Sequence, residues 1–479
     1  MGNTTMIVAA CLIPILGMIG GGLDVARAYT VKAKMQSACD AAALAARREM
    51  AGGAINQSAR DESANFFSFN FPPGTMQADP VNLSIEASDT DASVVEVAAS
   101  TSVPTTIMAL FGKDKIDLAV QCNADQDYVN NDIMLVLDVT GSMNCTAGTT
   151  CAYAATEQTN SRLSRLRTAS VSLYRALEGA RGVRTRYGFM PYSMTVNVGG
   201  DLNSNWIRDP ASYWQCTRTN GNRCQTWQSY VPTRSPAWPL LWKGCVEERS
   251  TISQNYQAQI RISTDVAQAD IDSVSTTDAK LKWQPYDDAA TTGYTDSIAD
   301  NLAHFCPARA GRLATYDSET AFQNKMNSML TSVGGYTNHD LGIMWAARYL
   351  SGTGMFQTDN PDTFNSIPVE RHIIFLTDGA MTASDTNYSS FGVTAAEDRM
   401  TGNGNSLNRH KTRFLNACDR ARQMGMTVWA IALDPNLGEA DDIKPCASGD
   451  DHFFTSDGSN LDRVFDQIGK GIGRLRITR

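Results

Sequence analysis

Residues that many enzymes and nucleic-acid-binding proteins depend on are scarce in this chain. Only 5 of its 479 residues are histidine, and 50 Asp and Glu outnumber 41 Lys and Arg, which gives a formal net charge of −9. An acidic chain with no block of like charges is a poor binder of nucleic acid, so no such partner is expected. The chain also lacks a Gly-x-Ser-x-Gly motif, which argues against an α/β-type serine hydrolase. With 42% hydrophobic residues it is not a disordered chain, and its length predicts roughly two to four structural units.

Charged side chains are absent from residues 1–23, which contain the stretch MIVAACLIPILGMIGGGL. At a rise of about 1.5 Å per residue, this segment is long enough to cross the hydrocarbon core of a membrane as a helix. A cleaved signal peptide would carry basic residues before a shorter apolar core, and none precede this one. We therefore expect residues 1–23 to be a retained, single-pass membrane anchor.

The cysteines indicate the compartment of the remaining chain. Eleven are present, without the Cys-x-x-Cys steps that are typical of zinc sites. Eight of them fall in successive pairs, which predicts disulfides in an oxidising compartment: Cys145 with Cys151, Cys216 with Cys224, Cys245 with Cys306, and Cys418 with Cys446. For Cys11, Cys39 and Cys122 the prediction is burial within a helix or strand.

Two signals disagree about the membrane topology. Arg27, Lys32 and Lys34 follow the predicted span and nothing basic precedes it, which by the positive-inside rule would keep the bulk of the chain cytoplasmic. The predicted disulfides require the opposite orientation, and a long domain is translocated largely regardless of nearby charge. We expect the bulk of the chain to lie outside the cytoplasm.

Residues 24–124 predict a small α+β unit. Residues 25–50 carry apolar side chains at helical spacing with no Pro or Gly, so the helix of the span is expected to continue beyond the membrane. Two strands are predicted from the alternation of apolar and polar residues in VNLSIEAS and SVVEVAAST. Pro104 precedes a short predicted helix in TTIMALFG, and a third strand is predicted in KIDLAVQC. A long Ala-rich helix on a small sheet looks pilin-like, and the plainer interpretation is a stalk.

A buried strand opens the second half of the chain. Residues 133–137 form a continuous apolar run, which is typical of a parallel strand covered on both faces, and Asp138, Thr140 and Ser142 follow it. In α/β folds, residues just past the carboxyl ends of the strands line the crevice that binds ligands. One carboxylate and two hydroxyls on a tight loop offer the oxygen ligands that a hard divalent cation prefers.

Two further loops supply oxygen atoms for the same crevice. In SVGGYTNHDLG the paired glycines allow a sharp turn, and Thr337 stands just before a helix. The strand RHIIFLTDG ends in Thr377, Asp378 and Gly379, which puts a second carboxylate at the end of a neighbouring strand. Five residues are thus expected to converge on one metal ion: Asp138, Thr140, Ser142, Thr337 and Asp378.

These motifs resemble the metal-ion-dependent adhesion site (MIDAS) of von Willebrand factor type A domains, in which Asp-x-Ser-x-Ser is followed by a Thr and then an Asp. Thr140 stands where the first Ser is usual and keeps the hydroxyl. The resemblance covers residues 132–479, including a closing strand MTVWAIAL and a final helix NLDRVFDQIG, and it implies a doubly wound, Rossmann-like α/β fold.

The same resemblance implies a divalent cation, Mg²⁺ by default, with Ca²⁺ or Mn²⁺ as alternatives. Thr140, Ser142 and Thr337 would touch the metal directly, while Asp138 and Asp378 act directly or through water. Because hydroxyl ligands bring little charge, the cation would keep a position for an acidic residue of a protein partner.

An enzyme interpretation of the same residues is disfavoured. The strand ending LDVTGS also looks a little like the nucleophile loop of aspartate-based phosphatases, but Thr140 occupies the place of that family's second Asp and removes its general acid/base. His339, two residues after Thr337, is expected in the first turn of a helix rather than as a base. We therefore predict a protein without catalytic residues.

The segment between the first two motifs is longer than the fold needs. Residues 200–316 are predicted to form a loop-rich insertion, which holds four of the paired cysteines. Five of its tryptophans are candidates for a common role: Trp206, Trp214, Trp227, Trp238 and Trp242. These rings either form an exposed binding patch or fill a small core held together by disulfides, and the core is the favoured interpretation.

A second resemblance joins the two halves of the chain. Four segments of the chain resemble TadE/TadG-like proteins of the bacterial tight-adherence, or Flp, pilus system, in particular their TadG branch. In chain order they are GGGLDVARAY, KMQSACDAAALAA, WKGCVEER and CASGDDHFF. This resemblance implies a single-pass inner-membrane protein with a periplasmic von Willebrand A domain, which contributes to assembly of a type IV-like pilus and has other pilus-assembly proteins as partners. The alternative is a surface-exposed adhesin that binds a host or extracellular ligand through the same site.

The predicted fold class is α/β, in four parts along the chain. They are the anchor in residues 1–23, the TadE/TadG-like helix with its small α+β unit in residues 24–124, a linker in residues 125–131, and the von Willebrand A domain in residues 132–479 with its insertion at about 200–316.

Overall fold

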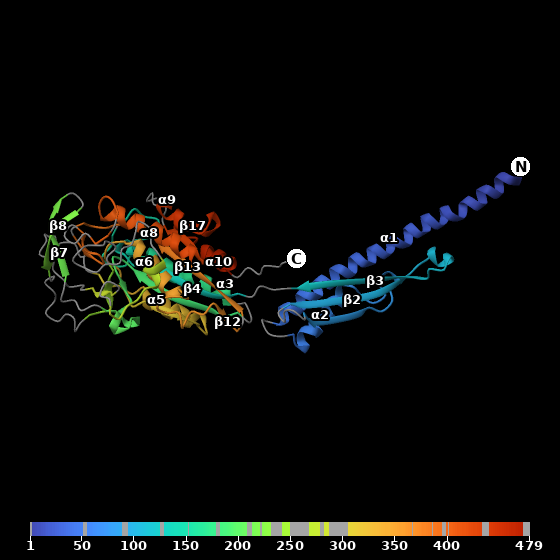
Figure 1. The fold of residues 1–479 in the computed structure, drawn as a ribbon, viewed down its shortest axis with the longest axis horizontal. Coiled ribbons are helices and arrows are strands. Elements are labelled where there is room, and N and C mark those ends of the chain that lie inside the picture. Colours follow the sequence, from blue (N-terminus) through green and yellow to red (C-terminus); the bar gives the residue numbers. More distant parts are fainter. Residues whose placement is uncertain are drawn as a thin grey trace. The chain divides into compact units, whose positions relative to one another are not determined.

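The chain forms two compact units in the computed structural model, consisting mainly of residues 1–128 and residues 129–473 (Figure 1). The change from one unit to the other falls inside the predicted linker. The structure describes residues 2–50, 55–88, 94–124, 129–151, 153–178, 183–207, 213–220, 223–230, 242–249, 268–277, 282–286, 305–365, 367–385, 387–394, 399–400, 402–433 and 440–472.

The first unit begins with one long helix, α1 (Gly2–Met50), which contains the predicted anchor and continues past it as expected. Within the described part of the chain, no helix is both long enough and apolar enough to cross a membrane. The side chains of residues 2–10 and 12–16 lie outside that part, so the membrane span remains a prediction.

The C-terminal half of α1 packs on a three-stranded antiparallel sheet with the order β1-β2-β3. Val31, Met35 and Ala42 of α1 are fully buried, against alternate residues of the strands such as Val97 and Val120. The strands and the turn in this unit follow the predicted segments: β1 (Asn82–Ala87), β2 (Val95–Pro104), the 3-10 turn η2 (Met108–Phe111) and β3 (Lys115–Ala124).

Two elements of the first unit were not predicted. Helix α2 (Gln57–Asn70) begins after Asn56, whose side chain accepts a hydrogen bond from the backbone N–H of Ala59, and it buries Phe67. The 3-10 turn η1 (Thr75–Gln77) follows it. The sequence between α1 and β1 is mostly polar, so it lacks the continuous apolar periodicity from which α1 was predicted.

The structure corrects the sequence prediction for all three remaining cysteines. Cys39 and Cys122 are buried as expected, but they form a disulfide that joins α1 to β3. Cys11, also predicted to be buried, is exposed and carries a free thiol. The missed disulfide links residues 83 positions apart, and proximity in sequence cannot reveal such a pair.

The second unit is built around a large, mainly parallel sheet with the order β10-β9-β6-β5-β4-β13-β16-β17. Strands β5, β4, β13, β16 and β17 are parallel neighbours, and β6, β9 and β10 extend the sheet in antiparallel pairing. The bounds of these strands are β4 (Asn130–Asp138), β5 (Thr185–Tyr192), β6 (Val196–Asn197), β9 (Cys245–Glu247), β10 (Gln284–Pro285), β13 (Ile367–Thr377), β16 (Met426–Leu433) and β17 (Phe453–Ser456).

Helices cover both faces of this sheet, which agrees with the predicted α/β class. Ile133, Leu135 and Leu137 of β4 point into one core together with α3 (Arg162–Glu178), α5 (Glu319–Met329) and α10 (Leu461–Ile472). Met134 and Val136 point into the other core with α6 (His339–Leu350) and α8 (Ser406–Gln423). A strand buried on both faces has no polar side to alternate with, and this explains its continuous apolar run.

The predicted end of the sheet was wrong. MTVWAIAL forms β16 as expected, but the sheet continues with β17, which pairs parallel to β16. At four residues, β17 is too short to show a pattern that distinguishes a strand from a loop.

Short elements complete the second unit. Two of them extend the large sheet, because β11 pairs antiparallel with β5 and β12 pairs antiparallel with β13. The others belong to loops and to the predicted insertion. In chain order the short elements are η3 (Gly141–Asn144), η4 (Gly199–Asp201), η5 (Ser204–Trp206), β7 (Tyr213–Asn220), β8 (Arg223–Tyr230), α4 (Gln268–Asp272), β11 (Gly311–Ala314), β12 (Thr363–Phe364), β14 (Tyr388–Ser389), β15 (Gly392–Val393), α9 (Ala440–Ile443), η8 (Lys444–Cys446) and η9 (Asp450–His452).

The described tryptophans of the insertion contribute to a core, which was the favoured interpretation. Trp206 and Trp242 are partly buried against the larger core, and Trp283, in the same segment, is completely buried beside Trp345. Trp238 and the side chains of Trp214, Trp227, Cys216 and Cys224 lie outside the described residues.

A buried ion pair fixes the insertion to helix α6. Glu248, which follows β9, accepts hydrogen bonds from both terminal nitrogens of Arg348 at 2.6 and 3.2 Å, and each side chain is only 1% exposed. The indole N–H of Trp283 donates to the same carboxylate at 3.1 Å. Since the groups satisfy one another, the insertion can pack against α6 without leaving a buried charge unpaired.

The other disulfide predictions that can be compared with the structure are confirmed. Cys145 is bonded to Cys151, Cys245 to Cys306, and Cys418 to Cys446. Disulfides therefore occur in both units.

Removing the Cys39–Cys122 disulfide tests its role in the first unit. Cys39→Ala combined with Cys122→Ala should lower the free energy of unfolding of this unit by about 2–5 kcal/mol, because the bond closes a long loop. Native-state hydrogen exchange of the β3 amides measures the loss. As a control, Cys418→Ala with Cys446→Ala removes a disulfide of the second unit and should leave β3 exchange unchanged; equal β3 protection in both double variants would contradict the prediction.

Candidate metal centre

The pairing of β4 with β13 brings two of the predicted loops together. The strands are parallel and in a register that sets Leu137 opposite Leu376, so the next residues, Asp138 and Thr377, are neighbours where both strands end. The hydroxyl of Thr377 donates to Oδ2 of Asp138 at 2.7 Å. The carboxyl ends of these strands thus meet at one edge of the sheet, as the sequence predicted.

The loop after β4 turns its oxygen atoms toward the same point. The backbone N–H and the hydroxyl of Thr140 both donate to Oδ1 of Asp138, at 2.9 and 2.7 Å. The hydroxyls of Thr140 and Ser142 lie 3.1 Å apart, and that of Ser142 donates to Oδ1 of Asp378 at 2.8 Å. Four of the five predicted residues therefore form one hydrogen-bonded cluster: Asp138, Thr140, Ser142 and Asp378.

Thr337 lies at the same edge, but it is held by different partners. The N–H of Gly334 donates to the carbonyl of Val139 at 2.9 Å, which fixes the loop against the end of β4. Thr337 exchanges two hydrogen bonds with Thr382, through its N–H and its carbonyl. Among the described residues, no hydrogen bond joins the Thr337 hydroxyl to the four-residue cluster.

Arg162, at the start of α3, was missed by the sequence analysis. Its Nη1 donates to Oδ2 of Asp378 at 3.0 Å and to the carbonyl of Ser142 at 3.0 Å, and its Nη2 donates to the carbonyl of Thr149 at 2.8 Å. The side chains of Arg162 and Asp378 are both completely buried. In the sequence this residue is one of three arginines in SRLSRLR, and no local feature distinguishes it from Arg165 and Arg167.

The cluster encloses two carboxylates, those of Asp138 and Asp378, with one guanidinium group, that of Arg162. Asp138 is 0% and Asp378 1% exposed. Burial raises the pKa of Asp138, and burial together with the negative charge of Asp138 raises the pKa of Asp378 to about 7, although Arg162 and Ser142 oppose this rise. With both carboxylates ionised the cluster has one excess negative charge, which a proton or a bound cation would stabilise.

The donor set fits a hard divalent cation. It consists only of carboxylate and hydroxyl oxygens, which suit Mg²⁺, Ca²⁺ and Mn²⁺ better than a softer metal. Ser142 and Gly379 are only partly buried, so the cluster borders on solvent and a ligand has a route to it. The described part of the chain contains no group of three or more His, Cys, Asp or Glu side chains that could hold a metal, so hydroxyl ligands are essential to this assignment.

His339 is the first residue of α6, as expected, and it packs behind the cluster. Its Nε2 lies 3.0 Å from the Thr377 hydroxyl, and its ring contacts those of Tyr192, Phe375 and Phe414. Burial lowers the pKa of His339 to about 3, so the imidazole is neutral at physiological pH. His339 therefore supports Thr377 without adding positive charge to the cluster.

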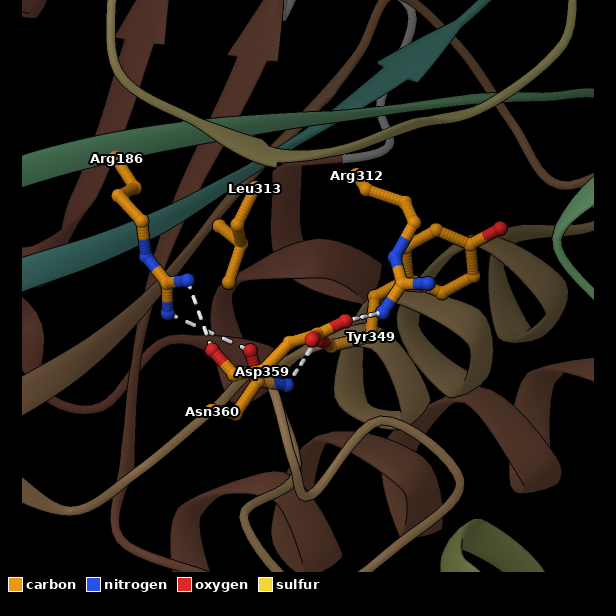
Figure 2. Close-up of a pocket in the computed structure, with 6 residues that line it drawn as sticks. All are labelled: Arg186, Arg312, Leu313, Tyr349, Asp359 and Asn360. Carbon is orange, nitrogen blue, oxygen red and sulfur yellow. Dashed lines mark hydrogen bonds and ion pairs between the residues drawn. The ribbon is translucent and has the colours of Figure 1, made fainter.

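Two cavities lie near the ends of the sheet. One, of about 100 Å³, adjoins the cluster and is bordered by His339, Gly379, Phe414 and Lys411. The other, of about 240 Å³, lies at the opposite end, where Figure 2 shows Arg186 and Arg312 on either side of Asp359.

The larger cavity is the weaker candidate for a ligand site. Arg186 donates to Asp132 at 2.7 Å and to the carbonyl of Asp359 at 2.8 Å, and Arg312 forms an ion pair with the Asp359 side chain. Carboxylates of the chain itself thus already neutralise both guanidinium groups. The Asp138 cluster, in contrast, has an excess charge that the chain does not neutralise.

Comparison with known proteins identifies a related family at the N-terminus. Residues 2–56 match the family model described as putative Flp pilus-assembly TadE/G-like. This part of the chain is TadE/G-like, as the sequence resemblance indicated. None of the curated proteins matches the chain.

Solved structures with some similarity include proteins of bacterial pili. The pilus adhesin SpaC from Lactobacillus rhamnosus GG is 11% identical, with a TM-score of 0.35 over 82% of this chain and 34% of that one. The von Willebrand factor domain of the type V pilus tip protein Mfa5 from Porphyromonas gingivalis is 12% identical, with a TM-score of 0.33 over 73% of this chain and 99% of that one. The PilB minor pilin from Streptococcus sanguinis is 11% identical, with a TM-score of 0.32 over 83% of this chain and 78% of that one.

These likenesses are too weak to assign a function. The TM-scores of 0.32 to 0.35 are low, and the chain spans about a third of the length of the pilus adhesin.

The raised pKa of Asp378 predicts how stability depends on pH in the absence of metal. Asp378 titrates near 3.8 when unfolded and near 7 when folded, so between these values the folded state holds one more proton than the unfolded state. The free energy of unfolding should therefore fall as pH rises from about 4 to 7, by at most about 4 kcal/mol from this group. Asp378→Asn should remove this contribution, as measured by urea unfolding in chelator at a series of pH values. Parallel pH profiles for the two proteins would show that the carboxyl is not perturbed.

Proposed function

We propose that this chain is a membrane-anchored, periplasmic component of Flp or type IV-like pilus assembly, of the TadG branch. Residues 129–473 act as a von Willebrand A-type domain that binds a protein partner through a divalent cation. In this proposal the chain works by binding and has no catalytic residues. The TadE/G-like match over residues 2–56 supports the pilus context.

The observation that carries the proposal is the hydrogen-bonded cluster at the carboxyl ends of β4 and β13. Asp138 and Asp378 would hold the cation through carboxylate oxygens, and Thr140, Ser142 and Thr337 would offer hydroxyl oxygens. When bound, the cation supplies an electrophilic position for an acidic side chain of the partner. Arg162, which is completely buried, would keep Asp378 in place through its hydrogen bond to Oδ2.

The disulfides support the periplasmic location. Cys39–Cys122 lies in the first unit, shortly after the predicted anchor, and Cys418–Cys446 lies in the second. Disulfides persist in the bacterial periplasm and are rare in a reducing cytosol. Both units are therefore placed outside the cytoplasm in this proposal, despite the basic residues that follow the anchor.

Thermal unfolding with and without Mg²⁺ tests the metal centre. Mg²⁺ should stabilise the unaltered protein, by about 2.7 kcal/mol at a concentration 100-fold above Kd, because it binds only the folded state. Asp138→Asn should abolish this gain. Since burial raises the pKa of Asp138, an uncharged and isosteric Asn should cost the metal-free protein little stability.

A matched control comes from the opposite end of the same sheet. Glu370, whose side chain is 58% exposed, lies near the start of β13, and Glu370→Gln removes one charge without touching the cluster. This variant should keep the full Mg²⁺ response. If Asp138→Asn and Glu370→Gln responded equally to Mg²⁺, the cation would be binding elsewhere.

Recovery of partners from crosslinked cell envelopes tests the function itself. The unaltered chain and Glu370→Gln should recover a pilus-assembly protein, and recovery should be lost with Asp138→Asn or with chelator. If that partner were recovered equally in all conditions, the metal centre would have no part in assembly. Metal-dependent recovery of only an extracellular ligand would favour the adhesin alternative.

A further inference from the structure

The turn η2, between β2 and β3, is fastened to the N-terminal half of α1. The carboxylate of Asp24 accepts hydrogen bonds from the backbone N–H groups of Thr106, Ile107 and Met108, at 2.9, 2.9 and 2.8 Å. Asp24 is 6% exposed, and these hydrogen bonds lower its pKa below the ordinary value. The carboxylate thus stays ionised at neutral pH and holds the turn against the helix.

Glycines on α1 make this close approach possible. A Cβ atom on Gly20 would lie 2.1 Å from Cγ2 of Ile107, and one on Gly17 would lie 3.1 Å from the ring of Phe111. A larger residue at position 20 would therefore force the turn away from the helix. The turn thus packs directly on the helix surface at Gly17, Gly20 and Gly21.

The helix and the turn together expose an apolar tip, which we define as Met18, Ile19, Leu23, Leu110 and Phe111. Their exposed fractions are 71%, 61%, 65%, 80% and 57%. These side chains lie at the same level of the helix, where the turn packs on it, and several exposed hydrophobic side chains of this size at one level indicate a surface that a membrane or a partner covers.

Polar and basic residues begin immediately beyond the apolar tip. Arg27 donates to the side chain of Gln77 at 3.0 Å, and Lys32, Lys34 and Lys113 are exposed. Tyr29 is 74% exposed. Basic residues and tyrosine next to an apolar surface are typical of the level of the lipid headgroups, where phosphate groups attract cations.

The change from uncharged to charged sequence places the tip at the edge of a bilayer. Residues 17–23 end an uncharged stretch of α1, and Asp24 and Arg27 are the first charged residues after it. Charged side chains are costly inside a hydrocarbon core, so residues 17–23 would lie where the helix leaves it. Because Phe111 packs beside Gly17, the turn reaches the same depth as this part of the helix.

We propose that η2 is a second membrane contact, which inserts Leu110 and Phe111 into the lipid beside α1. This inference rests on the membrane placement proposed above and is independent of the metal centre. A lone helix can rotate and slide in a bilayer, whereas a helix with a second apolar contact on one side has a fixed depth and orientation. The first unit would thereby present the sheet β1-β2-β3 in one orientation relative to the membrane surface.

Quenching of fluorescent probes by brominated lipids tests whether η2 contacts the membrane. The full chain is reconstituted into phospholipid vesicles and labelled with an environment-sensitive thiol probe, either at native Cys11 or at position 110 after Leu110→Cys with Cys11→Ser. Ser84→Cys with Cys11→Ser is the matched control, because Ser84 is exposed on the sheet. Cys11→Ser alone gives the background labelling. Quenching by lipids with brominated acyl chains should be several-fold stronger at positions 11 and 110 than at position 84.

The pattern of quenching distinguishes a lipid contact of η2 from a protein contact and from the absence of any membrane placement. Quenching at 11 without quenching at 110 would overturn the second contact and leave the membrane placement intact, whereas no quenching at either would overturn both. Crosslinking of position 110 to a protein in cell envelopes, with no lipid quenching there, would identify a protein as the occupant of the tip and would also overturn the proposal. Gly20→Val, which forces the turn off the helix, should reduce quenching at 110 and leave it unchanged at 11.

Discussion

The parallel pairing of β4 with β13 is the constraint on which the second unit depends. Its register joins loops far apart in the sequence, and Ser142 and Asp378 are hydrogen-bonded although 236 residues separate them. Both strands fill a core on each face, so a register shift would exchange the side chains between the two cores and draw polar residues from the strand ends into them. The free energy of two hydrophobic cores therefore fixes the distance between Asp138 and Asp378, and the side chains at the site do not have to fix it themselves.

The cluster itself is an unfavourable arrangement that the surrounding fold imposes. Two carboxylates are enclosed at the strand ends, and Arg162 neutralises only one of them. Placing like charges together away from water costs free energy, and such perturbed groups are concentrated at functional sites. Glu248 is the opposite case. Arg348, Arg249 and Trp283 surround its carboxylate, and although burial opposes the shift, the two arginines lower the pKa of Glu248 to about 2. Glu248 holds the insertion against α6, whereas the excess negative charge at Asp138 and Asp378 is what the proposed cation would neutralise.

Asp24 in the first unit shows a third environment for a carboxylate. Three backbone N–H groups point at it, and hydrogen bonding lowers its pKa where burial alone would raise it. The result is a connection between helix and turn that needs neither a disulfide nor a large core. Together with the Cys39–Cys122 bond further along α1, it attaches the small sheet to the helix at two levels.

Local patterns in the sequence determined the main elements of this protein: the long helix, the strands of the first unit, the buried runs of β4 and β13, the disulfides between nearby cysteines, and the residue types at the candidate metal centre. These features depend on neighbouring residues, so periodicity and spacing reveal them. Only the tertiary structure decided the Cys39–Cys122 bond, the position of β17 at the sheet edge, the burial of Arg162 against Asp378, and the separate hydrogen bonds of Thr337. Each of these is a contact between distant segments, and its partner is chosen by the packing of whole elements, which no local pattern records.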